Sequence, residues 1–237
     1  MLLVTAIAAF LIGFSKAGVG GTLSPFVTVL VALSLPADDA IGLLLPMLIV
    51  ADWFTITAHW RQWVTPIVLR LLAASVVGIA LGSTVLGSIS EPALRNLIAI
   101  AMLDFAAYYL ITKTQVAAHL SMTRAWPAGL IAGVSSALAH LGGPPILAYL
   151  LTTDLPPRKF VATSAALFTV TNMLKVPAYF LAGLFDGDLI ASNWYAWFAI
   201  PFGVMAGRAL VGRLDRNLFD RITTTLLVAG AILLLVT

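Results

Sequence analysis

Cysteine is absent from this sequence, and charged side chains are scarce. Without cysteine, the chain has no disulfide, no thiolate metal site and no thiol nucleophile. Asp, Glu, Lys and Arg make up only 10% of its 237 residues, whereas soluble domains carry about 25%. An ordinary water-soluble domain is therefore excluded. The three histidines, His59, His119 and His140, lie far apart and form no HExxH pair, so we expect neither a metal nor another cofactor.

Apolar residues take the place of the missing charge and reach 61% of the chain. A membrane-spanning helix needs about 20 mostly apolar residues, and the apolar stretches here are separated only by short polar breaks. We therefore expect an all-α integral membrane protein, a multi-pass protein of the cell (inner or plasma) membrane. Residues 1–237 would form a single transmembrane domain. The net charge of +3 is small, and the loop cations are expected on one side of the membrane, as argued below. This pattern argues against a nucleic-acid partner.

An internal repeat organises the chain. The residue pairs 120 positions apart are Gly13 and Gly133, Ser15 and Ser135, Ala17 and Ala137, and Pro25 and Pro145. The glycine series 78, 82, 87 returns 125 positions later as 203, 207, 212. Small residues four apart also arise from helix packing alone, but the collinear set of matches favours a duplication. We predict repeat 1 at 1–112, a cytoplasmic linker at 113–125 and repeat 2 at 126–237.

Each half contains four apolar segments, and the first segment of each half is interrupted. The segments are 1–34, 41–58, 64–87 and 94–112, then 126–153, 160–184, 193–212 and 218–237. The interruptions are 15–21, with the sequence SKAGVGG, and 140–145, with the sequence HLGGPP. Glycine and proline pairs break helices, and broken helices in transporters often mark the binding site.

The basic residues of the loops distinguish two topologies, because lysine and arginine accumulate on the cytoplasmic side. If all eight segments crossed the membrane, the loop cations would be divided between the two sides. If each interrupted segment enters and leaves by the same face, one side holds all seven, namely Arg61, Lys113, Arg124, Arg158, Lys159, Arg213 and Arg216. We predict this second arrangement, with six spanning helices and two re-entrant hairpins. Each half is then a broken or re-entrant hairpin plus three transmembrane helices, and the two repeats are inverted.

The two breaks could bind an anion. Each is followed by a new helix with proline in its first turn, where the missing proline N–H costs nothing. Such a start exposes free N–H groups and about half a positive charge, and two starts converging in low dielectric make an anion site. Lys16 adds a full charge, unless it snorkels toward an interface. Hydroxyls could come from Ser15, Ser24, Ser135 and Ser136.

Further polar residues lie inside the apolar segments. Asp52 and Asn172 are 120 positions apart, so the same helical position is polar in both halves, and Lys175 follows Asn172 by one turn. A charge at the bilayer centre costs about 2.5–3.5 kcal/mol and needs a partner or a purpose. Asp52 could pair with Lys16 or Lys175, or it could handle substrate or protons. His140 could be a core histidine, could donate to an anion, or could take a proton.

Four stretches carry a resemblance to a known family. They are GFSKAGVGG at 13–21, LPMLIVAD at 45–52, AHLGGPP at 139–145 and NMLKVPAY at 172–179. These stretches resemble the sulfite exporter TauE/SafE family, also called the toluene-sulfonate uptake permease family. The resemblance implies a carrier of the inner membrane that moves sulfite, thiosulfate, sulfonates or small carboxylates. It points to both breaks and to Asp52, Asn172 and Lys175.

We therefore predict a secondary transporter, with export preferred, that binds a small oxyanion between the two breaks. The predicted substrate-binding residues are Ser15, Lys16, Gly18, Gly20, Gly21, Ser24, Ser136, His140, Gly142, Gly143, Pro144, Asn172 and Lys175. Asp52 and His140 are the candidates for proton coupling. A passive anion channel and a proton-coupled uptake permease are the alternatives. A hydrolase using Ser135 or Ser136 with His140 is disfavoured because no GxSxG elbow is present. The expected partners are the small anion and the lipid bilayer, with a homodimer left open.

Overall fold

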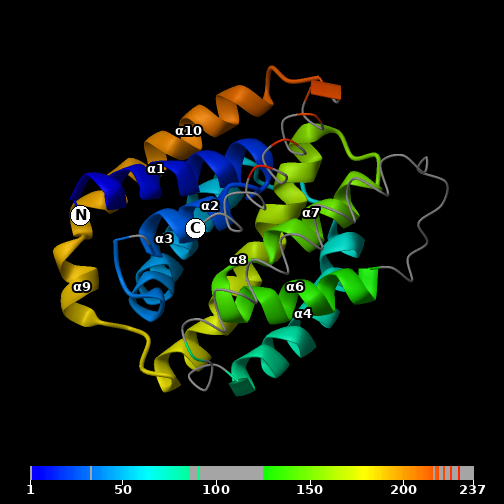
Figure 1. The fold of residues 1–237 in the computed structure, drawn as a ribbon. Helices are drawn as coiled ribbons and strands as arrows, with labels where there is room; N and C mark the ends of the chain where they lie inside the picture. The colour runs from blue at the N-terminus through cyan, green and yellow to red at the C-terminus, as the bar shows by residue number, and fades with distance from the viewer. Residues whose placement is uncertain are drawn as a thin grey trace.

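The computed structural model describes residues 2–32, 34–85, 90 and 125–215, and a few positions after 216. Within these residues all regular structure is helical (Figure 1), which confirms the all-α prediction. The first half contributes α1 (Leu2–Val19), α2 (Ser24–Ala32), α3 (Ala37–Ala58) and α4 (Thr65–Val85). The second contributes α6 (Ala125–Ala139), α7 (Gly143–Leu151), α8 (Pro157–Leu181), α9 (Gly187–Ser192), η2 (Trp194–Phe198) and α10 (Ala199–Val211). The predicted segments 94–112 and almost all of 218–237, and residues 113–124 of the linker, lie outside the described residues.

Both predicted interruptions occur, but their limits differ from those expected. α1 continues through Ser15 and Lys16 to Val19, so the first break is only Gly20–Leu23. The second break is His140–Gly142, and α7 begins at Gly143. Lys16 therefore lies on a helix, one turn before the break, because within 15–21 the left-handed backbone that ends the helix occurs at Gly20 and Gly21.

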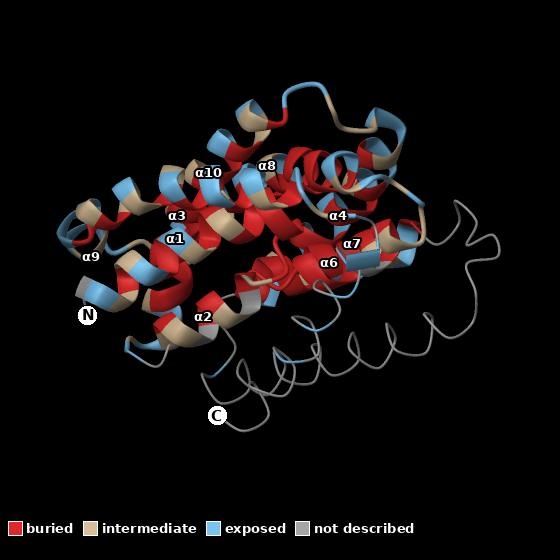
Figure 2. Ribbon diagram, turned by 90° about the horizontal axis from the view of Figure 1, so that it is seen from above, coloured by how far each residue is buried: buried red, intermediate tan, exposed pale blue. Residues whose placement is uncertain are grey.

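Two buried clusters form the interior, and each combines helices from both halves of the sequence. One packs α4 against α6, α7 and α8, and the other packs α10 against α1, α2 and α3. Figure 2 shows the buried residues concentrated between these helices. The outer surface stays apolar, with Leu181, Phe180 and Leu3 more than two-thirds exposed at 85%, 73% and 73%. A wide exposed apolar surface suits contact with lipid better than contact with water.

Glycines allow two helix pairs to approach closely, and the two contacts correspond. In Figure 1, α1 runs beside α10, and α4 runs beside α6. A Cβ on Gly13 would collide with the Ile200 carbonyl oxygen, and a Cβ on Gly133 would collide with that of Ser75. Gly13 and Gly133 are 120 positions apart, and Ser75 and Ile200 are 125 apart. Of the glycine series noted in the sequence, Gly78 and Gly82 line the α4–α6 interface, and Gly203 and Gly207 line the equivalent α1–α10 interface.

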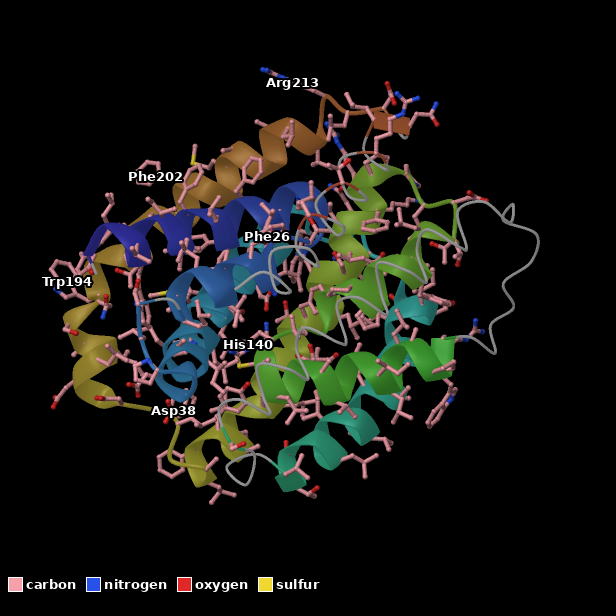
Figure 3. All side chains as sticks on the ribbon, in the orientation of Figure 1. Phe26, Asp38, His140, Trp194, Phe202 and Arg213 are labelled. Atoms are coloured by element: carbon pink, nitrogen blue, oxygen red, sulfur yellow. The ribbon has the colours of Figure 1, made fainter. Side chains whose placement is uncertain are left out.

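Charged loops gather at different ends of the molecule. Arg61, Arg158 and Lys159 line one pocket, whereas Asp39 lies close enough to Asp38 and Asp186 to interact with both. Figure 3 shows Asp38 and Arg213 on opposite sides of the molecule. The remaining loop cations of the topology prediction are Lys113, Arg124 and Arg216, and all three lie outside the described residues.

Two of the described helices are long and apolar enough to cross a membrane, Asp38–Ala58 and Thr65–Val85. The loop predicted around Asp186 instead contains the short helix α9. Its first turn is capped because Asp186 Oδ1 accepts hydrogen bonds from the N–H groups of Asp188 and Leu189, at 2.9 and 3.0 Å.

Candidate functional site

The first break is a tight turn held by Ser15. Gly20 and Gly21 have φ of +67° and +94°, a conformation that costs glycine little. The Gly21 N–H donates to the Ser15 carbonyl oxygen at 2.9 Å. The Leu23 N–H donates to Ser15 Oγ at 2.8 Å. We call residues 20–23 the first tip, and the side chain of Ser15 serves to hold it.

The second break repeats this geometry 120 positions later. His140 stands at the position equivalent to Gly20 and has φ of +58°. The Leu141 N–H donates to the Ser135 carbonyl oxygen at 3.2 Å, as Gly21 does to Ser15. α7 then begins with Gly143 and two prolines, and no side chain caps its N-terminus. We call residues 140–143 the second tip.

The two tips touch each other in the interior of the molecule. A Cβ on Gly143 would lie 3.2 Å from the Gly21 carbonyl oxygen. Both glycines are buried, and Figure 3 places His140 close to the centre of the molecule. Gly143 therefore permits a close approach to the backbone of the first tip that a larger residue would obstruct.

Lys16 and Asp52 form a buried ion pair beside the first tip. Lys16 Nζ lies 2.6 Å from Asp52 Oδ1, and the side chains are 4% and 0% exposed. Asn172 Nδ2 donates to the other carboxylate oxygen of Asp52 at 2.5 Å. Lys16 Nζ also lies 4.6 Å from the centroid of the Phe168 ring. The snorkelling alternative for Lys16 is therefore wrong, and of the two lysines considered for Asp52 the structure shows Lys16.

A second polar cluster surrounds Lys175 on α8. Its Nζ donates to the Ser136 carbonyl oxygen at 3.2 Å and lies 2.9 Å from His140 Nδ1. His140 Nε2 lies 2.8 Å from the Ile41 carbonyl oxygen, which can only accept. Nε2 therefore carries the imidazole hydrogen, and Nδ1 accepts from Lys175. The Tyr179 ring packs against His140, and its hydroxyl donates to the Ala137 carbonyl oxygen at 2.8 Å.

The two clusters lie close enough to interact electrostatically. Lys175 interacts with both Lys16 and Asp52, and His140 interacts with both lysines. Two amino groups thus share one carboxylate within the described part of the interior. An anion bound beside them would stabilise the charged form of either amino group, so the arrangement suits an anion.

The chain matches the family model described as "Sulfite exporter TauE/SafE" over residues 4–234. It belongs to the TauE/SafE family. Membership implies a membrane transporter of sulfur anions, because TauE/SafE proteins are transporters and not enzymes. Comparison with curated proteins and comparison with solved structures gave no match. The resemblance predicted from the four sequence stretches is thereby confirmed.

The remaining predicted residues of this TauE/SafE protein lie in different places. Gly20 packs against Phe160, Leu147 and Ser164, and Gly142 packs against Ser136. Pro144 is buried in the first turn of α7, and Ser24 is buried at the start of α2. Gly18 instead faces Gly207 of α10, so its contact belongs to helix packing and not to the tips.

Four buried hydroxyls outside the predicted site have no hydrogen-bond partner in the described structure, those of Thr22, Thr55, Ser75 and Ser83. Two of them, Thr22 Oγ1 and Ser75 Oγ, lie beside the tips. Thr22 belongs to the first tip. Ser75 lies on α4 and lines a cavity of about 10 Å³ together with Ser136, Gly142 and Thr171. Unsatisfied buried hydroxyls are costly and are therefore candidates for ligand contact. Nothing in the sequence distinguishes these two from the other threonines and serines of apolar helices.

Proposed function

We propose that this TauE/SafE protein is a secondary carrier that binds a small sulfur oxyanion where the two tips meet. The observation that carries the proposal is the contact between the tips beside two buried lysines and a single carboxylate. A sulfur oxyanion would stabilise the charged forms of both lysines. The lysines, Asn172 and the tip backbone would then be its binding residues.

The surroundings of the tips supply the hydrogen-bond donors that an oxyanion requires. The buried N-terminus of α7 has no side-chain cap, and a helix N-terminus attracts negative charge. Pro144 and Pro145 have no N–H, so Gly143 is the donor among its first three residues. Thr22 supplies a hydroxyl without a described partner. Because these donors lie in an interior of low dielectric, each interaction with an anion is stronger than in water.

The site is closed in this structure. The cavity beside the second tip, at about 10 Å³, has room for about one water molecule and not for a sulfur oxyanion. Binding therefore requires the helices around the tips to separate. Alternating access by movement of one half of the protein against the other would open the site to each side in turn.

Several contacts support two inverted repeats, residues 1–112 and 126–237, joined by a cytoplasmic linker. The glycine interfaces α1–α10 and α4–α6 correspond, and Asp52 bonds to Asn172, its equivalent 120 residues on. A contact between equivalent positions is expected where a two-fold axis passes between them. We further propose a multi-pass location in the inner membrane, with both hairpins re-entrant.

Export is the direction that the membrane potential favours for an anion. A cell interior negative by 100 mV drives each negative charge outward with about 2.3 kcal/mol, so an exporter needs no coupling ion. Uptake would require one, and Asp52 or His140 would then carry the proton.

Reconstitution into proteoliposomes tests the function. A panel of sulfite, thiosulfate, sulfate, a two-carbon sulfonate, acetate and chloride should show saturable flux for one or more of the sulfur anions. Preloaded unlabelled anion should accelerate uptake of the labelled one, since a carrier exchanges its substrate. A large unitary current without counter-transport would indicate that the protein is a channel and not a carrier. Absence of flux for the whole panel would contradict the proposal.

A further inference from the structure

A basic pocket opens at the end of the molecule where the cationic loops gather. Its volume is about 630 Å³, and it is lined by the α3–α4 loop, the first turn of α8 and the end of α10. Arg61 comes from the first of these segments, and Arg158 and Lys159 come from the second. None of the described residues that line the pocket is acidic. The pocket is therefore a concave surface of one charge sign, which concentrates oppositely charged solutes.

The inner wall of the basic pocket is fixed by hydrogen bonds between α8 and the α3–α4 loop. The Val64 N–H donates to Thr163 Oγ1 at 3.1 Å. The Thr163 hydroxyl donates in turn to the Lys159 carbonyl oxygen at 2.6 Å. Val64 and Lys159 both line the pocket, whereas Thr163 is fully buried. These bonds place the pocket directly outside the buried face of α8.

That buried face leads to the first tip. Phe160 follows Lys159 on α8 and is 0% exposed. A Cβ on Gly20 would lie 2.9 Å from Phe160 Cε1 and 3.1 Å from Ser164 Oγ. The Phe160 ring therefore contacts the first tip, and it belongs to the residue that follows Lys159 of the pocket.

We propose that the basic pocket is the vestibule through which small oxyanions reach the tips, and that Phe160 closes its inner end. This inference rests on the proposed transport function and extends it to a second, outer anion site. Arg61, Arg158 and Lys159 attract the anion, and displacement of Phe160 admits it to the contact between Gly20 and Ser164.

Thiol labelling tests the vestibule without any measurement of transport, because the natural chain has no cysteine. The variant Gln62→Cys places one thiol in the pocket. The ratio of its reaction rates with an anionic and a cationic methanethiosulfonate reagent is divided by the same ratio for a free thiol. We expect a normalised ratio of about ten at low ionic strength, decreasing with added salt.

The charge variants decide the outcome. Adding Arg158→Gln and Lys159→Gln to Gln62→Cys should return the ratio to near one. Arg213→Gln is the matched control, because Arg213 is exposed, does not line the pocket and points away from the body of the molecule in Figure 3. A ratio near one in Gln62→Cys itself, or equal changes in both sets of variants, would overturn the proposal.

Protection experiments identify the occupant. Sulfate should slow labelling of Gln62→Cys more than chloride at equal ionic strength, in vesicles of phosphatidylcholine. If only phosphatidylglycerol vesicles give protection, the pocket holds a lipid headgroup and the vestibule proposal is wrong.

Phe160 is tested with a thiol at the tip. Ser164→Cys should react slowly with the anionic reagent when Phe160 is present, and at least tenfold faster in combination with Phe160→Ala. Phe160→Leu, which preserves more of the packing, should give an intermediate rate and lower the melting temperature less than Phe160→Ala does. Equal labelling rates of Ser164→Cys with Phe160 and with Phe160→Leu would overturn the proposal that Phe160 closes the vestibule. None of these measurements involves flux, so the vestibule proposal and the carrier proposal are tested independently. Either one can be contradicted while the other is supported.

Discussion

At the scale of single residues, the interior charges decide what the site can bind. From the sequence alone, Asp52 could pair with Lys16 or Lys175, or it could handle substrate or protons. The structure pairs it with Lys16 at 2.6 Å and gives its second oxygen to Asn172. Lys175 is directed to His140 and the Ser136 carbonyl instead. Residue spacing could not distinguish the lysines, because the packing of α1, α3 and α8 decides which amino group reaches the carboxylate.

Replacing Lys16 should affect stability and transport separately. Lys16→Gln leaves Asp52 as a buried carboxylate without its cation, which costs about 3–5 kcal/mol. The double variant Lys16→Gln/Asp52→Asn removes both charges and should recover most of that loss. Anion flux should be absent in both. Melting temperature in detergent and flux in proteoliposomes measure the two effects, and normal flux in the double variant would remove Lys16 from the binding site.

His59 lies just outside the membrane-spanning segment Asp38–Ala58. Its imidazole leads us to expect that the stability of the protein depends on pH. Burial holds the pKa of its imidazole below the usual value, and the charges of Arg208 and Arg158 lower that pKa further. The hydrogen bond to the Ala17 carbonyl acts in the opposite direction. The unfolded chain then binds a proton more readily than the folded one, so stability is complete above the ordinary histidine pKa and decreases as the pH falls through it.

The corresponding measurement is the melting temperature between pH 8 and pH 5. It should fall on acidification in the natural protein, and less so in His59→Gln, whose side chain keeps a donor for the Ala17 carbonyl. An identical decrease in both proteins would assign the effect to other groups.

At the scale of helices, the breaks and the glycine interfaces have different origins. Both breaks were predicted because glycine and proline act locally on the backbone. Their limits were wrong by several residues: α1 continues through Lys16, whereas a histidine at φ +58° ends the second tip's helix. The partners of the glycine series could not be predicted, because a packing stripe does not specify which helix covers it.

The two glycine interfaces should respond alike to substitution. A Cβ on Gly78 would collide with the Leu130 carbonyl oxygen, and one on Gly203 with that of Phe10. Gly78→Ala and Gly203→Ala should each destabilise the protein by about 1–3 kcal/mol through overpacking. Gly187→Ala is the control, since nothing lies within 4 Å of its added Cβ. Denaturation midpoints compare the three, and a large loss at only one interface would contradict their equivalence.

At the scale of the whole molecule, we propose that the separation of charge sets the orientation in the membrane. Arg61, Arg158 and Lys159 share one pocket, and the Asp38–Asp39 loop approaches Asp186 at another end. The hairpin α1–α2 begins and ends near these acidic loops. Near its start, Thr5 bonds to Tyr195 of η2, which follows the loop that contains Asp186. After its end, the chain enters α3, whose first turn contains Asp38. The end of α7 leads instead to Pro156 and Pro157 of the basic pocket.

This arrangement predicts opposite accessibility for two exposed positions. A thiol at Arg213→Cys should react with a membrane-impermeant reagent only from the cytoplasmic side, and one at Asp188→Cys only from the other. Labelling intact cells and inverted vesicles measures both. The proposed topology puts both termini outside the cell, so a C-terminal reporter that functions only in the cytoplasm should be inactive. Reaction of both thiols from one side would contradict the topology.

The sequence by itself determined the helical class, the family, the two breaks and the glycine pattern, because composition, backbone preference and short motifs act over a few residues. Only the tertiary structure decided that the tips touch, that Lys16 takes Asp52, that Thr22 and Ser75 lack described partners, and that loop cations share a pocket. These features join residues as far apart as Asp52 and Asn172, 120 positions along the chain. Contacts over such distances depend on how whole helices pack, and no local pattern specifies that packing.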